Sequence, residues 1–358
     1  MNIFGRDIKR DEITKKIGDI SQFGGIKSYE FSDGKAKGIR AVDIKTPCGI
    51  DMTVLLDRAM DISSFTYKNI PIAWRSSNKE TSPVYYESKG FEFQRTFFGG
   101  LLTTCGLTYI GAPSTDNGED LGLHGRISNL PAENVYADGK WDGNSYVMWV
   151  QGKIREAGIF QDKLELTRKI TIWMDKPGIL IQDSVENIGS ETSPIMILYH
   201  INIGFPLLDT QSELIIPKAK TIPRDSEAEK GINSFTRFTE PIRSFSEQVY
   251  FHDIEPDSEG NCSAALVNRA FNNNQGLGIS LKFNKKNLPY LIQWKQMGFG
   301  EYVCGIEPAN SFVRGRAIER QEKTLRFIEP GEKIDYRLEL DVLESNKEID
   351  AKTFRKLS

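Results

Sequence analysis

Apolar and polar residues alternate with a period of two along most of the chain. Residues 334–342 read Ile-Asp-Tyr-Arg-Leu-Glu-Leu-Asp-Val, a pattern that gives a strand one buried and one solvated face. Residues 277–283 alternate in the same way, and residues 170–174 carry another apolar face. Residues 176–179 read Lys-Pro-Gly-Ile, which suits a type II turn. The pattern therefore predicts a hairpin over residues 166–186.

Strand-like segments of this kind recur from residue 27 to residue 343, separated by clusters of Gly, Pro, Asn and Asp. Long amphipathic helices between the strands are missing, which argues against a parallel α/β sheet. We therefore expect an all-β fold with few short helices, in which residues 27–343 form one large antiparallel β-sandwich domain. Residues 206–246 are the least patterned segment, and we expect an excursion or a lid there.

The two ends of the chain differ from this pattern. Residues 10–17 contain good helix formers, and Asp7 is a candidate cap for that helix. We therefore treat residues 1–26 as an N-terminal extension with a short helix. Residues 344–358 are expected to form a C-terminal tail.

Composition narrows the classes of protein. Hydrophobic residues make up 39% of the chain, charged residues 27%, and the net charge is −3. This balance is ordinary for a soluble globular protein and argues against binding to nucleic acid or to an anionic membrane. The first residues lack the apolar run of a signal peptide, and no segment has the roughly 20 apolar residues of a membrane span. The four cysteines are scattered, so we expect a cytoplasmic protein with reduced thiols. The sequence indicates no oligomeric state.

One of only three histidines, His124, lies between two glycines in Leu-Gly-Leu-His-Gly-Arg, residues 121–126. Gly122 and Gly125 permit a sharp turn and a close approach of a ligand to the backbone. In an extended segment, His124 and Arg126 would point the same way and would suit a ligand with oxygen acceptors. A turn with a structural histidine explains the motif equally well.

His200 lies in Ile-Met-Ile-Leu-Tyr-His-Ile-Asn-Ile, residues 195–203, a strand that is apolar on both faces and is predicted to be buried on both sides. Met196, Leu198, His200 and Asn202 share one face of that strand. A buried imidazole needs a hydrogen-bond partner. His200 and Asn202 are therefore candidates for a pocket wall, and the alternative is a core histidine bonded to a carbonyl.

Glu307 lies in Gly-Ile-Glu-Pro, and Pro308 confines it to an extended backbone. A carboxylate at a strand end among apolar residues loses solvation, which raises its pKa and makes it a stronger base. The alternative is an exposed glutamate in a turn.

Arg58 and Arg95 are embedded among apolar residues, where arginine is seldom left unpaired. For Arg58 an internal ion pair with Asp57 or Asp61 is the simpler explanation. Arg95 has no carboxylate within two residues and is a candidate ligand-binding residue. For His252 a His–Asp pair at the surface is favoured over a site, although the sequence leaves both roles open.

No phosphate-binding loop, dinucleotide-binding glycine motif or His-x-x-His metal motif is present. We therefore expect no cofactor and no metal.

Three motifs occur in a fixed order: Leu-His-Gly-Arg at 123–126, Tyr-His-Ile-Asn-Ile-Gly-Phe-Pro at 199–206 and Gly-Ile-Glu-Pro at 305–308. Two further motifs precede them, Asp-Arg-Ala-Met-Asp-Ile at 57–62 and Gly-Gly-Leu-Leu-Thr-Thr-Cys-Gly-Leu at 99–107. Together they resemble the aldose 1-epimerases, or galactose mutarotases, and most closely a less-characterised related branch. The resemblance covers roughly residues 15 to 343.

This resemblance implies a β-supersandwich with an open sugar cleft. It implies that Glu307 is the general base, that His200 is the general acid, and that His124 and Arg95 hold the sugar. The chain departs from the family at Arg126, where mutarotases usually have glycine, and around His200, where they usually read His-Pro-Tyr-Phe-Asn. The aspartate that binds sugar hydroxyls in that family has no match here.

The predicted reaction is the interconversion of sugar anomers. Glu307 takes the proton of the C1 hydroxyl while protonated His200 gives one to the ring oxygen. His124, Arg126, Arg95 and Asn202 are the candidate sugar-binding residues. Guanidinium groups suit carboxylate, phosphate or sulfonate, which suggests an acidic sugar.

Two alternatives remain open. His124, His200 and Glu307 are also a set of ligands for a divalent metal, as in a metal-dependent sugar isomerase or lyase. A non-catalytic sugar-binding or sensing protein on the same scaffold would bind sugars without changing the rate of anomer exchange.

Overall fold

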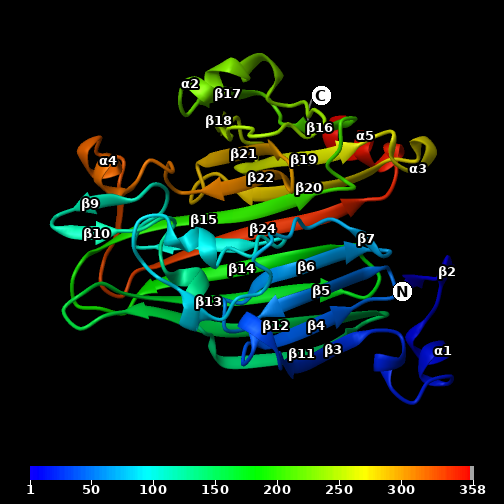
Figure 1. Cartoon of the computed structure of the whole chain (residues 1–358). Coiled ribbons are helices and arrows are strands. Elements are labelled where there is room, and N and C mark those ends of the chain that lie inside the picture. The colour runs from blue at the N-terminus through cyan, green and yellow to red at the C-terminus, as the bar shows by residue number, and fades with distance from the viewer. Residues whose placement is uncertain (355–358) are drawn as a thin grey trace.

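The computed structural model describes residues 1–354, and Figure 1 shows that long antiparallel strands dominate it. One sheet has eight strands in the order β11 (Glu133–Asp142), β12 (Ser145–Ala157), β13 (Lys163–Trp173), β14 (Gly178–Asn187), β24 (Lys333–Leu343), β20 (Leu277–Asn284), β19 (Asn261–Asn268) and β16 (Ser212–Ile215). The predicted hairpin is confirmed, because β13 pairs antiparallel with β14.

A second sheet has seven strands. Six follow the order β17 (Ala219–Pro223), β18 (Gln248–Ile254), β21 (Tyr290–Gly298), β22 (Glu301–Ala309), β15 (Ser193–Gly204) and β23 (Arg326–Ile328). The seventh, β8 (Thr103–Leu107), pairs with β15 beside this path. A third sheet has five strands in the order β3 (Gly25–Glu30), β4 (Arg40–Lys45), β5 (Ile50–Leu55), β6 (Asp61–Tyr67) and β7 (Ile70–Pro71).

The remaining elements are short. Two small hairpins are formed by β1 (Asn2–Ile3) with β2 (Arg6–Asp7) and by β9 (Ser114–Asp116) with β10 (Glu119–Leu121). The α-helices are α1 (Arg10–Thr14), α2 (Ser226–Lys230), α3 (Phe271–Asn274), α4 (Arg316–Gln321) and α5 (Asn346–Phe354). Short 3-10 turns span Ile20–Gln22, Gly34–Ala36, Pro83–Tyr85, Glu92–Arg95, Ile127–Asn129 and Ile232–Ser234. No helix among the described residues is both long and apolar enough to cross a membrane.

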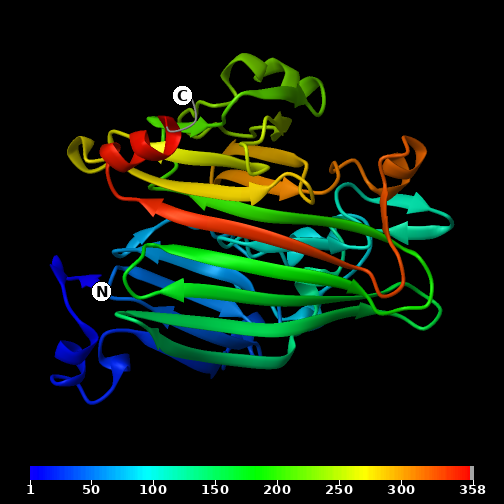
Figure 2. The same cartoon turned by 180° about the vertical axis from the view of Figure 1, so that it is seen from behind.

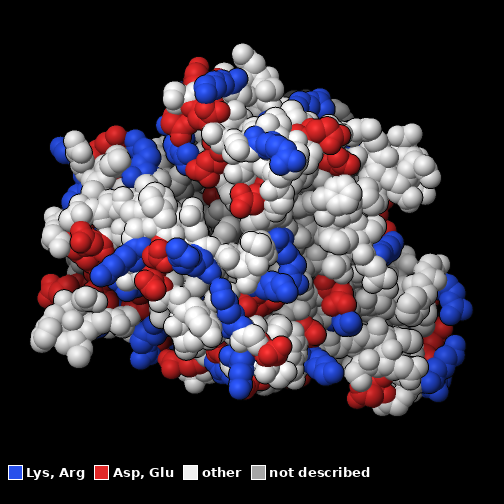
Figure 3. All heavy atoms as spheres, in the orientation of Figure 1, with Lys and Arg blue, Asp and Glu red and all other residues white. Residues whose placement is uncertain are grey.

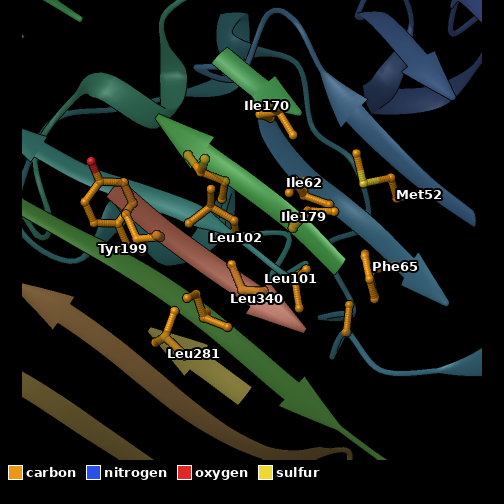
Figure 4. Packing of buried hydrophobic residues seen from close by; sticks show 14 of the residues in the cluster. Met52, Ile62, Phe65, Leu101, Leu102, Ile170, Ile179, Tyr199, Leu281 and Leu340 are labelled. Atoms are coloured by element: carbon orange, nitrogen blue, oxygen red, sulfur yellow. The ribbon is translucent and has the colours of Figure 1, made fainter. Parts of the chain in front are cut away.

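The core lies between the eight-stranded sheet and the other two large sheets. Figures 1 and 2 show two layers: the eight-stranded sheet forms one layer, and the five- and seven-stranded sheets together form the layer that faces it. Figure 4 shows residues of both layers meeting there, such as Met52 and Phe65 from the five-stranded sheet and Ile170, Ile179 and Leu340 from the eight-stranded sheet. The expected all-β antiparallel sandwich is therefore what the chain forms.

Strand β15 is buried along its whole length, as its sequence predicted. Tyr199 and Ile201 face the main core, whereas Met196 and Leu198 belong to a second apolar cluster on the opposite face of the sheet. Because His200 lies on the same face as Leu198, it points away from the main core toward that second cluster.

The prediction that Asp7 caps the first helix is wrong. Helix α1 begins at Arg10, so its N-cap position is Lys9, which makes no side-chain cap bond. Asp7 belongs to β2 instead, and its carboxylate lies 3.5 Å from the amino group of Met1. At the other end of the chain, α5 occupies most of the expected tail, and residues 355–358 lie outside the described residues.

Candidate active site

Strand register brings His200 and Glu307 together. In the β15–β22 ladder, Leu198 pairs with Ala309 and Ile201 with Ile306, so His200 lies beside Glu307. The imidazole Nε2 is 3.3 Å from Glu307 Oε1, and both side chains are buried. Two polar groups that are about a hundred residues apart in sequence thus form one pair on the outer face of the seven-stranded sheet.

Glycine at position 305 makes room for this pair. Gly305 lies two residues before Glu307 on β22, so the two positions share one face of the sheet. A Cβ atom at position 305 would lie 2.3 Å from Glu307 Oε1. The glycine therefore leaves the space that the carboxyl group occupies.

His124 reaches the same place from a tight turn. Its φ is +59° and that of Gly125 is +80°, both in the left-handed region. A Cβ atom at position 125 would lie 2.2 Å from the carbonyl oxygen of Gly106, so only glycine fits there. The rings of His124 and His200 lie 5.8 Å apart between centroids. A non-glycine residue at positive φ is uncommon, and the turn fixes the direction in which the His124 ring points.

The three groups face a cavity of about 180 Å³. Its other polar lining residues are Gln94, Arg224 and Glu247, and its apolar ones include Phe97, Trp294, Val249, Ile292 and Val313. Figure 3 shows that this face of the molecule is hollowed below the segment that carries β17 and α2. Positive and negative side chains are interspersed over the same face.

Arg224 and Glu247 are site residues that the sequence patterns did not single out. Arg224 Nη1 lies 2.9 Å from Glu247 Oε1, and Trp294 Nε1 donates to Glu247 Oε2 at 2.8 Å. Arg224 lies inside the least patterned segment, residues 206–246, and Glu247 directly follows that segment. The lack of periodicity there was the only signal, because the ion pair joins residues 23 positions apart.

Burial governs the pKa values of the site. Desolvation raises the pKa of Glu307 well above its usual range, and the nearby Glu247 carboxylate adds to that effect. Desolvation lowers the pKa of His200 to about 3, with the neighbouring His124 as a further cause. It also lowers the pKa of His124 to about 4, with Arg224 contributing. At neutral pH both imidazoles are therefore uncharged, and a proton held by the His200–Glu307 pair resides on the carboxyl group, because its pKa is the higher of the two.

Several polar atoms at the site have unmet hydrogen-bonding capacity. Within the described structure, Nδ1 of His124, Nδ1 of His200 and Oε1 of Glu307 are buried and make no hydrogen bond. The 3.3 Å contact of Glu307 Oε1 with His200 lacks hydrogen-bond alignment. Buried polar groups are nearly always hydrogen-bonded in folded proteins. These atoms are therefore available to a polar ligand in the cavity.

Three predicted sugar-binding residues lie elsewhere in the described structure. Arg95 does not line the cavity, and its exposed guanidinium pairs with Glu92 at 2.7 Å. Asn202 is buried behind the site, where its amide donates to the carbonyl oxygens of Gly100 and His200. Arg126 also lies outside the cavity lining. The expectation that it points the same way as His124 required an extended backbone, which the turn at His124 does not provide.

The ion pair expected for Arg58 is not formed. The Arg58 guanidinium is fully buried and donates to three backbone carbonyl oxygens, those of Thr81, Thr96 and Ser128. The neighbouring carboxylates of Asp57 and Asp61 pair instead with Arg40 and Arg168.

The surface His–Asp pair favoured for His252 is also wrong. The ring is fully buried, with Nδ1 2.9 Å from Thr221 Oγ1 and Nε2 3.3 Å from Gln293 Oε1. The role of this histidine is therefore set by its burial in the β18 ladder, with Thr221 and Gln293 as polar partners.

The chemistry open to this arrangement is proton transfer. Among the described residues, no group of three or more His, Cys, Asp or Glu side chains has the geometry to hold a metal ion. A carboxyl group of raised pKa beside an imidazole of lowered pKa is suited to take and give protons at one ligand.

Comparison with solved structures shows the class of protein to which the fold belongs, the galactose mutarotase-like β-sandwiches. A candidate aldose 1-epimerase from Klebsiella pneumoniae is 23% identical with a TM-score of 0.88, and the match covers 97% of this chain and 90% of that one. A galactose mutarotase-like protein from Clostridium acetobutylicum is 15% identical with a TM-score of 0.61, covering 90% and 99%. A galactose 1-epimerase from Lactobacillus acidophilus is 12% identical with a TM-score of 0.58, covering 90% and 99%.

The chain belongs to the family described as a domain of unknown function (DUF4432), which residues 36–342 match. No curated protein matches the sequence.

Proposed function

We propose that this protein is an aldose 1-epimerase-like isomerase that interconverts sugar anomers by acid–base ring opening. The observation that carries the proposal is the buried His200–Glu307 pair, 3.3 Å apart in a cavity where polar atoms of both residues have no partner. The likeness of the fold to proteins named as aldose 1-epimerases and galactose mutarotases supports the same activity.

In this reaction Glu307 accepts the proton of the C1 hydroxyl while the His200 imidazolium gives a proton to the ring oxygen. The bond between C1 and the ring oxygen breaks, the aldehyde rotates, and closure on the other face reverses both transfers. The pair holds one proton in total before and after the cycle. Each such partner typically contributes about 10²–10⁴-fold to a rate.

The pKa directions favour both transfers once the charged pair has formed. An imidazolium of pKa about 3 is a strong acid toward the ring oxygen, and a carboxylate of raised pKa is a strong base toward the hydroxyl. The opposing cost is the proton shift from Glu307 to His200 that must precede the step. The two groups lie 3.3 Å apart and must align for a hydrogen bond before the proton can pass directly between them.

His124 holds the sugar in this proposal. Its pKa of about 4 keeps the ring neutral, so it offers one donor and one acceptor to hydroxyl groups. Phe97 and Trp294, which line the cavity next to His200, provide apolar surfaces for the C–H face of the ring. Because they lie outside the lining, Arg95, Arg126 and Asn202 receive no sugar contact.

The test is NMR exchange spectroscopy on a panel of neutral and acidic aldoses. We expect the wild-type protein to accelerate anomer exchange for at least one sugar and Glu307→Gln to lose about 10²-fold or more of that rate. Glu165→Gln is the matched control, since Glu165 is also a buried carboxylate but lies on β13 outside the cavity.

Equal rates for Glu307→Gln and the wild type would remove Glu307 from the role of base. Binding of sugars without any acceleration of exchange would identify a sugar-binding protein instead. Loss of activity on treatment with a chelator would favour the metal-dependent isomerase.

A further inference from the structure

One side of the cavity is an aliphatic wall made of Val249, Ile292 and Val313. Val249 comes from β18, Ile292 from β21, and Val313 from the loop that follows β22. All three are buried members of the same apolar cluster. None of these side chains can accept or donate a hydrogen bond.

The aliphatic wall begins directly beside the acid–base pair. Ile292 is the cross-strand partner of Glu307, and Val249 is that of Trp294. Cross-strand partners project to the same face of a sheet, with their Cβ atoms about 4.5–5.5 Å apart. Ile292 therefore adjoins the carboxyl group on the side opposite His200.

The third member joins the wall to the turn that carries His124. The carbonyl oxygen of Val313 accepts a hydrogen bond from Ala112 N at 3.0 Å, and His124 N donates to the neighbouring Gly111 oxygen, also at 3.0 Å. A sugar held by His124 and reacting at Glu307 would thus lie within reach of the aliphatic wall.

An ordinary hexose has a hydroxyl group on nearly every carbon. A hydroxyl pressed against the aliphatic wall loses its water partners and gains none, which is costly, whereas a methyl or methylene group gains by leaving water. The C–H face of the sugar already has Phe97 and Trp294 to pack on. The wall is therefore apolar surface beyond what a fully hydroxylated sugar needs.

Charge in the cavity argues against an acidic sugar. Among the described lining residues, Arg224 is the only arginine or lysine, and it already pairs with Asp225 and Glu247. Glu247 and Glu307 supply carboxyl groups to the same cavity. A second anion there would meet repulsion without a free cation.

We propose that the substrate is a neutral deoxy sugar whose methyl or methylene carbon packs against Val249, Ile292 and Val313, as in a 6-deoxyhexose or a 2-deoxyhexose. This inference rests on the proposed function for the reaction. The preference of the aliphatic wall is a property of binding, and it can be measured whether or not the reaction occurs.

The test compares each deoxy sugar with its fully hydroxylated parent, using hexoses of both enantiomeric series and a uronic acid. Dissociation constants are measured by ligand-observed NMR, and anomer exchange by exchange spectroscopy. For at least one pair we expect the deoxy sugar to bind about tenfold or more tightly than its parent, and the uronic acid to bind weakest.

Val249→Thr and Val313→Thr each place a hydroxyl on the aliphatic wall with little change in shape. Both are expected to lower the ratio of deoxy to parent affinity at least about threefold. Val150→Thr is the control, because Val150 is buried in the main core away from the cavity and should leave the ratio unchanged. A ratio for two sugars on one sample does not depend on how much of that variant is folded.

The outcomes separate the two proposals. Tighter binding of a deoxy sugar without accelerated anomer exchange would contradict the proposed reaction and support the preference of the aliphatic wall for deoxy sugars. Exchange that is equally fast and binding that is equally tight for parent and deoxy sugars would overturn the inference while the isomerase remains. Preferred binding of the uronic acid, or no binding across the panel, would also overturn it.

Discussion

The substitution Gly305→Ala tests whether the position of the Glu307 carboxyl group matters for activity. The added Cβ would lie 2.3 Å from Glu307 Oε1, whereas ordinary contacts of a Cβ atom begin at 3.4 Å. The difference, 3.4 − 2.3 = 1.1 Å, is the displacement that the carboxyl group must accept if the strand stays in place. Trp294 Cβ, at 3.1 Å from the new atom, limits relief on the other side.

A misplacement of about 1 Å at a reacting group typically costs on the order of 10²-fold in rate. We therefore expect Gly305→Ala to lower kcat/KM for anomer exchange about 100-fold while the near-UV circular dichroism stays that of the wild type. Gly298→Ala, at the end of β21, is the control. The atom nearest to its added Cβ would be Oε1 of the flexible Gln296 side chain, at 3.2 Å. A folded Gly305→Ala protein within about twofold of wild-type kcat/KM would refute this reasoning.

Three further predictions concern protonation and the buried ion pairs. The reactive pair works with one proton, so kcat/KM should fall at low pH only near the His200 pKa of about 3, and at high pH only above the raised pKa of Glu307. A fall on the acid side near the ordinary histidine pKa of 6.5 would contradict the assignment. Asp183→Asn should cost about 3–5 kcal/mol in urea unfolding, because Asp183 accepts bonds from buried Arg168 and from Tyr199, and a cost under about 1 kcal/mol would contradict this. His252 has a pKa of about 4 when folded and 6.5 as the ordinary value, so stability is present above pH 6.5 and is lost as the pH falls toward 4. The difference between these two pKa values corresponds to about 3 kcal/mol of unfolding free energy. Between pH 7.5 and pH 4, the unfolding free energy of His252→Gln should therefore fall by about 3 kcal/mol less than that of the wild type. Parallel curves of unfolding free energy against pH for the two proteins would contradict this role of His252.

The strands were predictable because each carries its own alternation. The hairpin over 166–186 and the strand over 334–342 follow from period and turn residues alone, and the burial of β15 on both faces follows from its unbroken apolar run. These signals are local, so a single sequence contains them.

Three residues of the candidate site were predictable from the sequence, but the geometry of the site was not. The sequence marked His124, His200 and Glu307 as candidates, whereas their meeting depends on the register of β15 against β22, which is a non-local pairing. Arg224 and Glu247 were missed because they lie in, or directly after, a segment without period, and their contact becomes visible only when β17 pairs with β18. Arg58 was misread because backbone carbonyl groups, which leave no trace in side-chain patterns, satisfy it.

The most direct test of the central claim is a double-mutant cycle with Glu307→Gln, His200→Gln and the combined variant, measured as anomer exchange on the best sugar of the panel. If the two side chains act as one acid–base unit, the combined variant should lose about as much rate as the more damaging single variant, because removing either partner already disables the transfer. Losses that multiply would mean that His200 and Glu307 act independently and would contradict the claim.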